Sequence, residues 1–233
     1  VIHLYEPALA AARTYDRQCA YFSSSVLAAA VDGFRPFLAR LVERGYDGPR
    51  PAIRLLVNEA LTAADAEALM GRGDDAPLVR HLLSRLDEPR GAGERARLGV
   101  LAWLVRAGIL AVRVGVMRNH SGINHAKFGV VTDVHGNRLL FTGSANESAA
   151  AISSNYEEFI VYGDWRDDTS AGIVRHYVER FESMWADDDK YVHTIDLPTA
   201  VRDEVVRFAP PEPPDPETLA PGPDPLAVDR ARA

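Results

Sequence analysis

The sequence lacks a second cysteine. Cys19 is the single cysteine among 233 residues, so no intrachain disulfide can form. It lies in an apolar and aromatic stretch, which predicts a buried structural side chain. A disulfide-stapled fold is therefore excluded, and a hydrophobic content of 47% predicts a globular domain with its own core.

Long apolar runs are also absent. No stretch of about 18 uninterrupted apolar residues occurs, which argues against a membrane-spanning helix. Residues 1–11 lack the basic and apolar regions of a signal peptide. We therefore expect a cytoplasmic protein without a membrane partner.

An excess of positive charge is missing as well. The net charge of −7 argues against a broadly basic surface that coats nucleic acid, so any phosphate site must be local. Lysine is scarce, because only Lys127 and Lys190 occur among 26 basic residues. A lysine kept at position 127 in an arginine-rich chain indicates a need for a compact point charge.

The hydrophobic pattern predicts alternating helices and strands. Helices are expected at 8–13, 26–44, from Thr62 onward, 78–86, 95–107 and 171–185, the last being the final packed helix. Strands are expected at 19–22, 52–58, 109–117, 128–132, 138–141 and 158–162. Gly108 is expected to end a helix, and 135–137 to form a hairpin turn. The pattern predicts an α/β domain with a mixed sheet between helices.

The C-terminal segment has a different composition. Residues 210–225 contain eight prolines in sixteen positions, and four of the other eight residues are acidic. Such a composition does not build a packed core. We expect a domain over 1–209 and a linker or disordered tail over 210–233.

Two groups of polar residues indicate a phosphate site. His125 and Lys127 are two residues apart, so on one strand they would project from the same face and present an imidazole beside an ammonium group. Gly143 and the residues after it follow the end of an expected strand, where hydroxyl, amide and backbone N–H groups can converge on phosphate oxygens. The polar residues that follow are Ser144, Asn146, Asn155 and Glu157.

Together these residues resemble the phospholipase D superfamily, whose motif runs His-x-Lys, then Asp, then Gly-Ser-x-Asn and often a later Asn-x-Glu. The resemblance covers residues 125–162 and implies a phospholipase D-like mixed β-sheet sandwiched between helices. One departure is Thr132, which stands where the family usually has its aspartate. The nearest acid is Asp133, one position later, so its role is left open.

A weaker resemblance extends over the start of the chain. Residues 4–7, 15–17 and 21–24 resemble the opening of phospholipase D-like domains that precede helicases in bacterial restriction and defence proteins, and 141–147 (FTGSANE) and Trp165 fit that subgroup. In such proteins a linker and an ATP-driven motor follow. The resemblance implies DNA as a partner and a fused or associated helicase or ATPase.

The resemblance also implies a mechanism. His125 would attack phosphorus to give a phosphohistidine, a second histidine would protonate the leaving oxygen, and water would complete hydrolysis. Lys127, Ser144 and Asn146 would stabilise the developing charge. Glu157 would orient the imidazole of His125.

Other groups complete this expected site. Only one His-x-Lys motif occurs, so a homodimer that shares one composite site is the economical source of a second histidine. We expect Gly143, Asn155, Arg113 and Arg118 to contact the substrate. The mechanism needs no cofactor, and the histidines form no recognisable metal-ligand motif.

Three functions remain open at this point. The first is a metal-independent DNA endonuclease of a bacterial restriction or phage-defence system. The second is a non-catalytic module that binds DNA or a partner protein, which the displaced Asp133 and the acidic net charge allow. The third is a lipid phosphodiesterase or phosphatidyl transferase, which would normally need an apolar membrane-facing surface.

Overall fold

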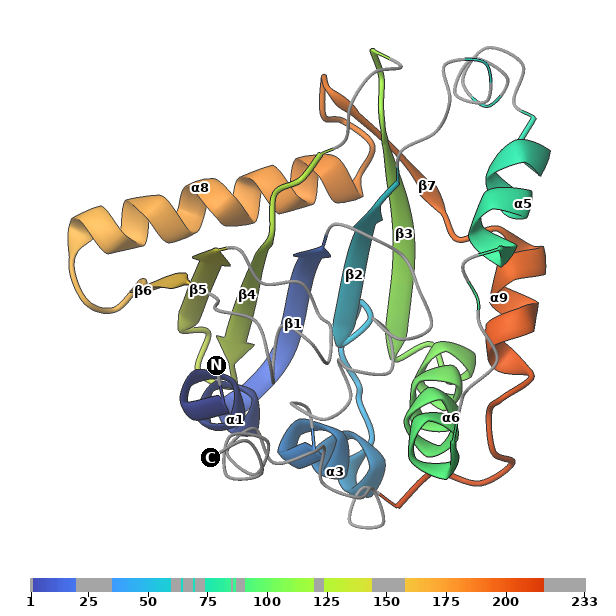
Figure 1. Ribbon diagram of the computed structural model, residues 1–233. Coiled ribbons are helices and arrows are strands. Elements are labelled where there is room, and N and C mark those ends of the chain that lie inside the picture. Colours follow the sequence, from blue (N-terminus) through green and yellow to red (C-terminus); the bar gives the residue numbers. More distant parts are fainter. Residues whose placement is uncertain are drawn as a thin grey trace, which may run out of the picture.

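A seven-stranded mixed sheet runs through the molecule (Figure 1), in the order β6-β5-β4-β1-β2-β3-β7. The computed structural model describes residues 2–19, 35–59, 64, 69, 74–84, 86, 91–119, 124–143 and 158–215. The strands are β1 (Ala12–Cys19), β2 (Ile53–Asn58), β3 (Leu110–Met117), β4 (Phe128–Asp133), β5 (Arg138–Gly143), β6 (Phe159–Gly163) and β7 (Val192–Asp196). Strands β1, β2 and β3 are parallel, and the other neighbouring pairs are antiparallel.

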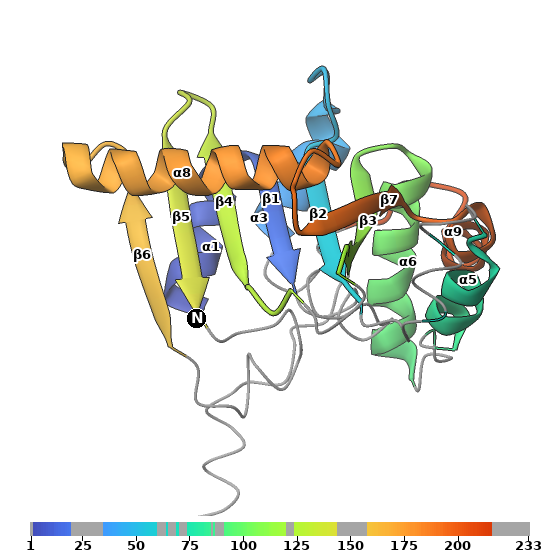
Figure 2. The ribbon, with the colours of Figure 1, turned by 90° about the horizontal axis from the view of Figure 1, so that it is seen from above.

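Helices cover both faces of this sheet. They are α1 (Ile2–Ala11), α3 (Arg35–Arg44), α5 (Ala76–Leu83), α6 (Ala92–Arg106), α8 (Asp168–Trp185) and α9 (Thr199–Val206). Figure 2 shows α8 lying across one face, with α1, α3 and α6 on the opposite side and α5 and α9 beside α6. The expected α/β architecture with a mixed sheet between helices is therefore confirmed. No helix in the described ranges is both long and apolar enough to cross a membrane.

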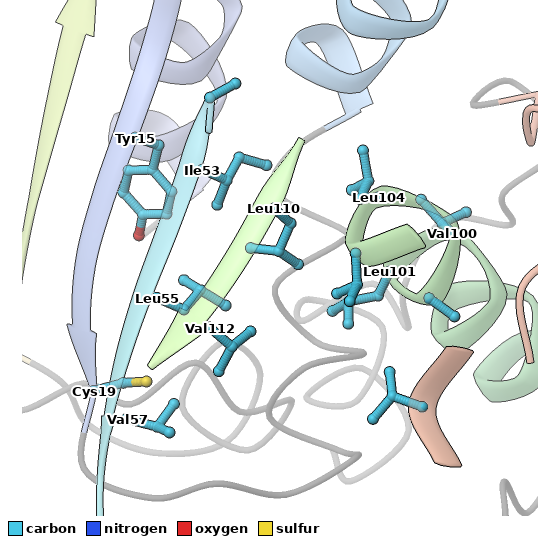
Figure 3. Close-up of a cluster of buried hydrophobic side chains, with 14 of the residues drawn as sticks. Tyr15, Cys19, Ile53, Leu55, Val57, Val100, Leu101, Leu104, Leu110 and Val112 are labelled. Carbon is cyan, nitrogen blue, oxygen red and sulfur yellow. The ribbon is translucent and has the colours of Figure 1, made fainter. Parts of the chain in front are cut away.

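The two faces of the sheet pack two hydrophobic clusters. The larger cluster joins β1, β2 and β3 to α6, and Figure 3 shows Tyr15, Leu55 and Val112 in it beside Leu101 and Leu104. The smaller cluster lies under α8 and is formed by Leu56, Phe128, Val130, Leu140, Val174, Phe181, Met184 and Val192. Consecutive residues of β2 enter different clusters, as the pleat of a strand buried on both faces requires.

The central strand β1 was not expected. We predicted a helix at 8–13 and a strand at 19–22, whereas α1 ends at Ala11 and β1 occupies Ala12–Cys19. The segment contains the polar residues Asp16, Arg17 and Gln18. All three are buried. Asp16 binds Arg50 and Arg54, and Arg17 lies over the ring of Phe141. Residues 20–22 lie outside the described part of the chain.

Most other elements agree with the prediction within a few residues. Gly108 follows α6 with a φ of 71°, and Gly136 forms the β4–β5 turn with a φ of 89°, as their roles as helix terminator and turn residue require. Helix α3 is the described part of the predicted helix at 26–44, while 26–34 and 60–63 lie outside the described residues. The prediction that 171–185 is the last packed helix is wrong, since β7 and α9 follow it.

Helix α9 was missed because it is only eight residues long and buries little more than Val201 and Val205. It ends before the proline-rich segment. The guanidinium of Arg106 donates hydrogen bonds to the carbonyls of Pro210 and Pro211, and residues 216–233 lie outside the described part. The boundary expected at 209–210 stays a prediction.

Candidate active site

Several motif segments meet at one edge of the sheet. Strands β1, β2 and β3 all end there, at Cys19, Asn58 and Met117, and we call it the carboxyl edge. Antiparallel pairing places the start of β4, the end of β5 and the start of β6 at the same edge. Ligands of open α/β sheets commonly bind at the carboxyl ends of parallel strands. The carboxyl edge is therefore the candidate active site.

His125 and Lys127 lie together at this edge. The Nζ atom of Lys127 is 2.9 Å from Nδ1 and 3.1 Å from Nε2 of His125, and it donates a 3.0 Å hydrogen bond to the His125 carbonyl oxygen. His125 is exposed, whereas Lys127 is only 5% exposed. The predicted juxtaposition of imidazole and ammonium is thus present.

The local backbone differs from the prediction. We placed His125 and Lys127 on a strand, but β4 begins at Phe128, so both residues belong to the segment that enters the strand. The carbonyl of Lys127 accepts hydrogen bonds from the N–H of Gly143 and the hydroxyl of Thr142, each at 3.2 Å. These two hydrogen bonds fix the backbone of Lys127 to β5, although Lys127 itself is not part of a strand.

A second anchor holds the same segment on α8. The side-chain amide of Asn124 lies 3.6 Å from the sulfur of Met184, and its oxygen accepts a 3.3 Å hydrogen bond from the N–H of Ala126. His125 is therefore flanked on both sides by residues attached to the sheet or to α8. This arrangement leaves its ring exposed on a supported backbone.

The remaining motif residues are placed only through their neighbours. Gly143 ends β5 and pairs with Phe159, the first residue of β6, at the carboxyl edge. Ser144, Asn146, Asn155 and Glu157 lie outside the described residues, so their predicted roles stay predictions. The chain leaves the sheet for this segment and returns from it at the edge that carries His125.

The two arginines that we expected to bind substrate both have protein partners. Arg113 donates a 2.7 Å hydrogen bond to Asp196, bonds the carbonyl of Trp185 and lies over its ring. Arg118, directly after β3, bonds the side chain of Asp187 at 2.5 Å.

The guanidinium of Arg118 also donates to the backbone carbonyls of Asp187 and Asp189 in the α8–β7 connection and of Val192, the first residue of β7. These contacts give Arg118 a structural role at the carboxyl edge. Phosphate binding by either arginine stays a prediction.

Asp133 lies at the other end of β4. Its carboxylate accepts hydrogen bonds from the N–H groups of His135 and Asn137 and from the side-chain amide of Asn137. The Asn137 side chain, together with these backbone groups, lowers the pKa of Asp133. Asp133 therefore stabilises the β4–β5 turn, away from His125.

One pair at the carboxyl edge was missed in the sequence. Glu59 follows β2 directly, and its side chain is 1% exposed. Its carboxylate lies 2.9 Å from Nε2 of His81, a ring one-third exposed at the end of α5. The available signal was an acidic residue placed directly after a buried strand, because a charge at that position is rarely buried without a partner.

Within the described ranges, no group of three or more His, Cys, Asp or Glu side chains is arranged to hold a metal ion. The carboxyl edge instead offers imidazole and ammonium groups, which suit nucleophilic attack and charge stabilisation at a phosphodiester. Independence from metal stays a prediction for the whole protein.

Comparison with known protein families identifies a domain in this chain. A family model described as "Cardiolipin synthase, PLD-like domain" matches residues 52–185, which is more than half of the chain. The matched region begins just before β2, ends with α8 and includes His125 and Lys127. No curated protein matches the chain.

Proposed function

The chain belongs to the family of phospholipase D-like domains, and from this we propose that it is a metal-independent phosphodiesterase that cuts DNA. The observation that carries the proposal is the 2.9 Å contact between the ammonium of Lys127 and the ring of His125 at the carboxyl edge. A nucleophilic imidazole with an adjacent buried cation suits attack on an anionic phosphodiester.

The proposed reaction has two steps. A ring nitrogen of His125 attacks phosphorus, the bond to the leaving oxygen breaks, and a phosphohistidine forms. Water then attacks phosphorus and releases His125. Lys127 stabilises the charge on the phosphoryl oxygens, with Ser144 and Asn146 as further donors, and Glu157 orients the imidazole.

DNA is proposed as the substrate because of the N-terminal resemblance to domains of bacterial restriction and defence helicases. In this proposal the protein acts as an endonuclease in phage defence, with a helicase or ATPase fused to it or associated with it. The net charge of −7 supports a concentrated substrate site over a broad basic surface.

The test is incubation of the purified protein with single-stranded, duplex and plasmid DNA in excess EDTA. We expect cleavage by the wild type and loss of cleavage in His125→Ala. His135→Ala is the matched control, because this histidine is exposed in the β4–β5 turn at the opposite end of β4. Cleavage that persists in His125→Ala would rule out the proposed nucleophile.

A second candidate is a phospholipase D-like module that binds DNA or a partner without cutting. The position of Asp133 favours it, because the acid nearest to the usual aspartate position stabilises a turn away from His125. Salt-sensitive DNA binding without turnover would support this alternative.

Anionic phospholipid vesicles belong in the same assay, since the matching family model carries the name of a lipid enzyme. Release of lipid head groups without DNA cleavage would identify lipid, and not DNA, as the substrate.

The proposed chemistry needs a second imidazole to protonate the leaving oxygen. A homodimer that brings two copies of His125 to one site is one source.

A further inference from the structure

Three polar side chains are buried on the face of the sheet that α8 covers. Gln18 of β1, Asn58 of β2 and Thr194 of β7 are 0%, 1% and 6% exposed. Within the described part of the chain, four of their side-chain atoms have no hydrogen-bond partner: Nε2 and Oε1 of Gln18, Oδ1 of Asn58 and Oγ1 of Thr194. An unpaired polar atom in a protein interior is costly, so these four atoms need an explanation.

The register places all three side chains on the same face. Gln18 pairs with Leu56 of β2, which belongs to the cluster under α8. Asn58 follows Leu56 by two residues, and Thr194 follows Val192, another member of that cluster, by two residues. Residues two apart on a strand share a face of the sheet. The unpaired atoms therefore lie between the sheet and α8.

Asn58 and Thr194 approach each other over a glycine. Gly115 of β3 pairs with Asn58 on one side and with Thr194 on the other. A Cβ atom on Gly115 would lie 2.9 Å from Oδ1 of Asn58, so this amide leans over β3. The other end of the amide sets its orientation, since Nδ2 donates a 2.9 Å hydrogen bond to the carbonyl of Cys19 on β1. Oδ1 therefore faces the side of the sheet that carries the Thr194 hydroxyl.

The neighbouring polar residues on this face are paired within the protein. Asp16, two residues before Gln18, accepts a 2.7 Å hydrogen bond from Arg54, and Arg54 also bonds Glu182 of α8. Among the described residues of the α8 face, the unpaired atoms thus belong to the part nearer the carboxyl edge, where Asn58 ends β2.

The chemistry of the four atoms indicates the ligand. Gln18 offers a donor and an acceptor, Asn58 offers an acceptor, and the Thr194 hydroxyl can serve as either. A cation cannot accept a hydrogen bond from Nε2 of Gln18, and an anion cannot donate one to Oδ1 of Asn58. A water molecule both donates and accepts, and buried waters typically make about three hydrogen bonds to groups of this kind.

One water molecule cannot serve all three side chains. Strands β1 and β7 are three strand spacings apart, roughly 14 Å, whereas a water between two partners spans about 5.6 Å at ordinary hydrogen-bond lengths. We propose that at least two buried waters lie between the sheet and α8, one joining Oδ1 of Asn58 to Oγ1 of Thr194 and one at the amide of Gln18. This site is separate from the proposed phosphodiester chemistry and does not depend on it.

Apolar variants of similar shape test the proposal by the sign of a stability change. Thr194→Val and Gln18→Met nearly keep the size of the side chain and remove its hydrogen-bonding atoms. Because each variant deprives a buried water of a partner, the melting temperature should fall by about 3–8 °C. Thr132→Val is the matched control, because Thr132 is partly exposed on β4 and its variant should stay within about 2 °C of the wild type.

The opposite sign would contradict the proposal. If no water pairs with these atoms, the wild type buries them unsatisfied, and their removal leaves the melting temperature unchanged or raises it. An unchanged or raised melting temperature in Thr194→Val and Gln18→Met would therefore overturn the buried waters.

A high-resolution crystal structure of the wild type locates the waters directly, even if Gln18→Met fails to fold. We expect electron density for a water within about 3.2 Å of both Oδ1 of Asn58 and Oγ1 of Thr194, and its loss in Thr194→Val. A direct hydrogen bond between these two side chains, or no density at either position, would overturn the proposal. Neither measurement uses DNA cleavage, so a failure of the proposed function would leave this result unchanged.

Discussion

The guanidinium of Arg54 binds the carboxylate of Asp16 across β2 and β1 through two hydrogen bonds, 2.7 Å from Nε and 2.9 Å from Nη2. The same guanidinium bonds Glu182 of α8 at 2.6 Å and lies over the rings of Phe181 and Trp185. Arg54 therefore joins the two central parallel strands to the helix that covers them. This charged junction adds to the apolar contacts of Phe181 and Met184 that hold the end of α8 on the sheet.

Replacement of Arg54 by Met should destabilise the fold by about 3 kcal/mol, at the lower end of the range for breaking a buried ion pair. The loss leaves Asp16 buried, but Arg50 still bonds both of its carboxylate oxygens, at 3.0 Å and 3.1 Å. Urea unfolding at neutral pH measures the change. Arg207→Met is the matched control, because Arg207 and Glu204 are both about half exposed and the variant should lose less than about 1 kcal/mol.

The stability of the protein should fall in acid partly through Glu182. The hydrogen bond from Arg54 holds the pKa of Glu182 below its ordinary value. A carboxyl whose pKa is lower in the folded state contributes stability above its unfolded pKa, about 4.3 for Glu, and loses that contribution as the pH falls through the folded pKa. Glu182→Gln should therefore be less stable than the wild type at pH 7.

The difference between Glu182→Gln and the wild type should shrink as the pH falls from about 4.3 downward. Urea unfolding across this range measures both proteins. Glu179→Gln, one turn away on α8, has no hydrogen bond with Arg54 and should follow the wild type at every pH. A constant difference between Glu182→Gln and the wild type would show that the carboxylate charge contributes nothing.

Much of the fold could be predicted from periodicity, because the strands β2 to β6 are largely apolar runs bounded by turn residues. Strand β7 (VHTID) is not such a run and was not predicted. Strand β1 could not be predicted, since its buried charged residues contact residues distant in sequence: Asp16 binds Arg50 and Arg54, and Arg17 lies 5.0 Å from the centre of the Phe141 ring. Charged residues predict exposure until their partners are known.

The candidate site, like the fold, could be predicted from the sequence only in part. The His125–Lys127 contact was predicted from the two-residue spacing, even though β4 begins at Phe128, one residue after Lys127. The Glu59–His81 pair joins residues 22 positions apart, so a local pattern can indicate that Glu59 is buried but not which residue pairs with it. The register that brings these two pairs to one edge exists only in the folded sheet.

Gly129 should not tolerate a side chain. A Cβ atom at this position of β4 would lie 2.3 Å from the ring of Phe141, which is 2% exposed and stacked 6.2 Å from Tyr15. Gly129→Ala should therefore destabilise the protein by about 1–3 kcal/mol, as overpacked core substitutions do. Gly172→Ala is the contrast, because nothing lies within 4 Å of its Cβ position and alanine favours a helix by up to about 1 kcal/mol. Thermal unfolding should move in opposite directions for the two variants.

Lys127 should not be replaceable by arginine. Its ammonium is held between the ring and the carbonyl of His125, in a position that is only 5% exposed. An arginine keeps the charge but carries a longer, planar head group that cannot occupy the same point beside the imidazole. Lys127→Arg should therefore lower kcat for DNA cleavage about 10²–10³-fold, as loss of a preorganised charge-stabilising donor does.

Lys190→Arg is the matched control for this substitution. Lys190 is exposed, and its ammonium lies 4.5 Å from the centre of the Tyr191 ring, a contact that an arginine can also make. The initial rate of DNA cleavage by Lys190→Arg in EDTA should stay within about twofold of the wild-type rate, because the substitution keeps a positive charge at the same exposed position. If Lys127→Arg cleaved DNA as fast as Lys190→Arg, the site would need only a positive charge near His125. The survival of a lysine at position 127 in an arginine-rich chain would then say nothing about catalysis.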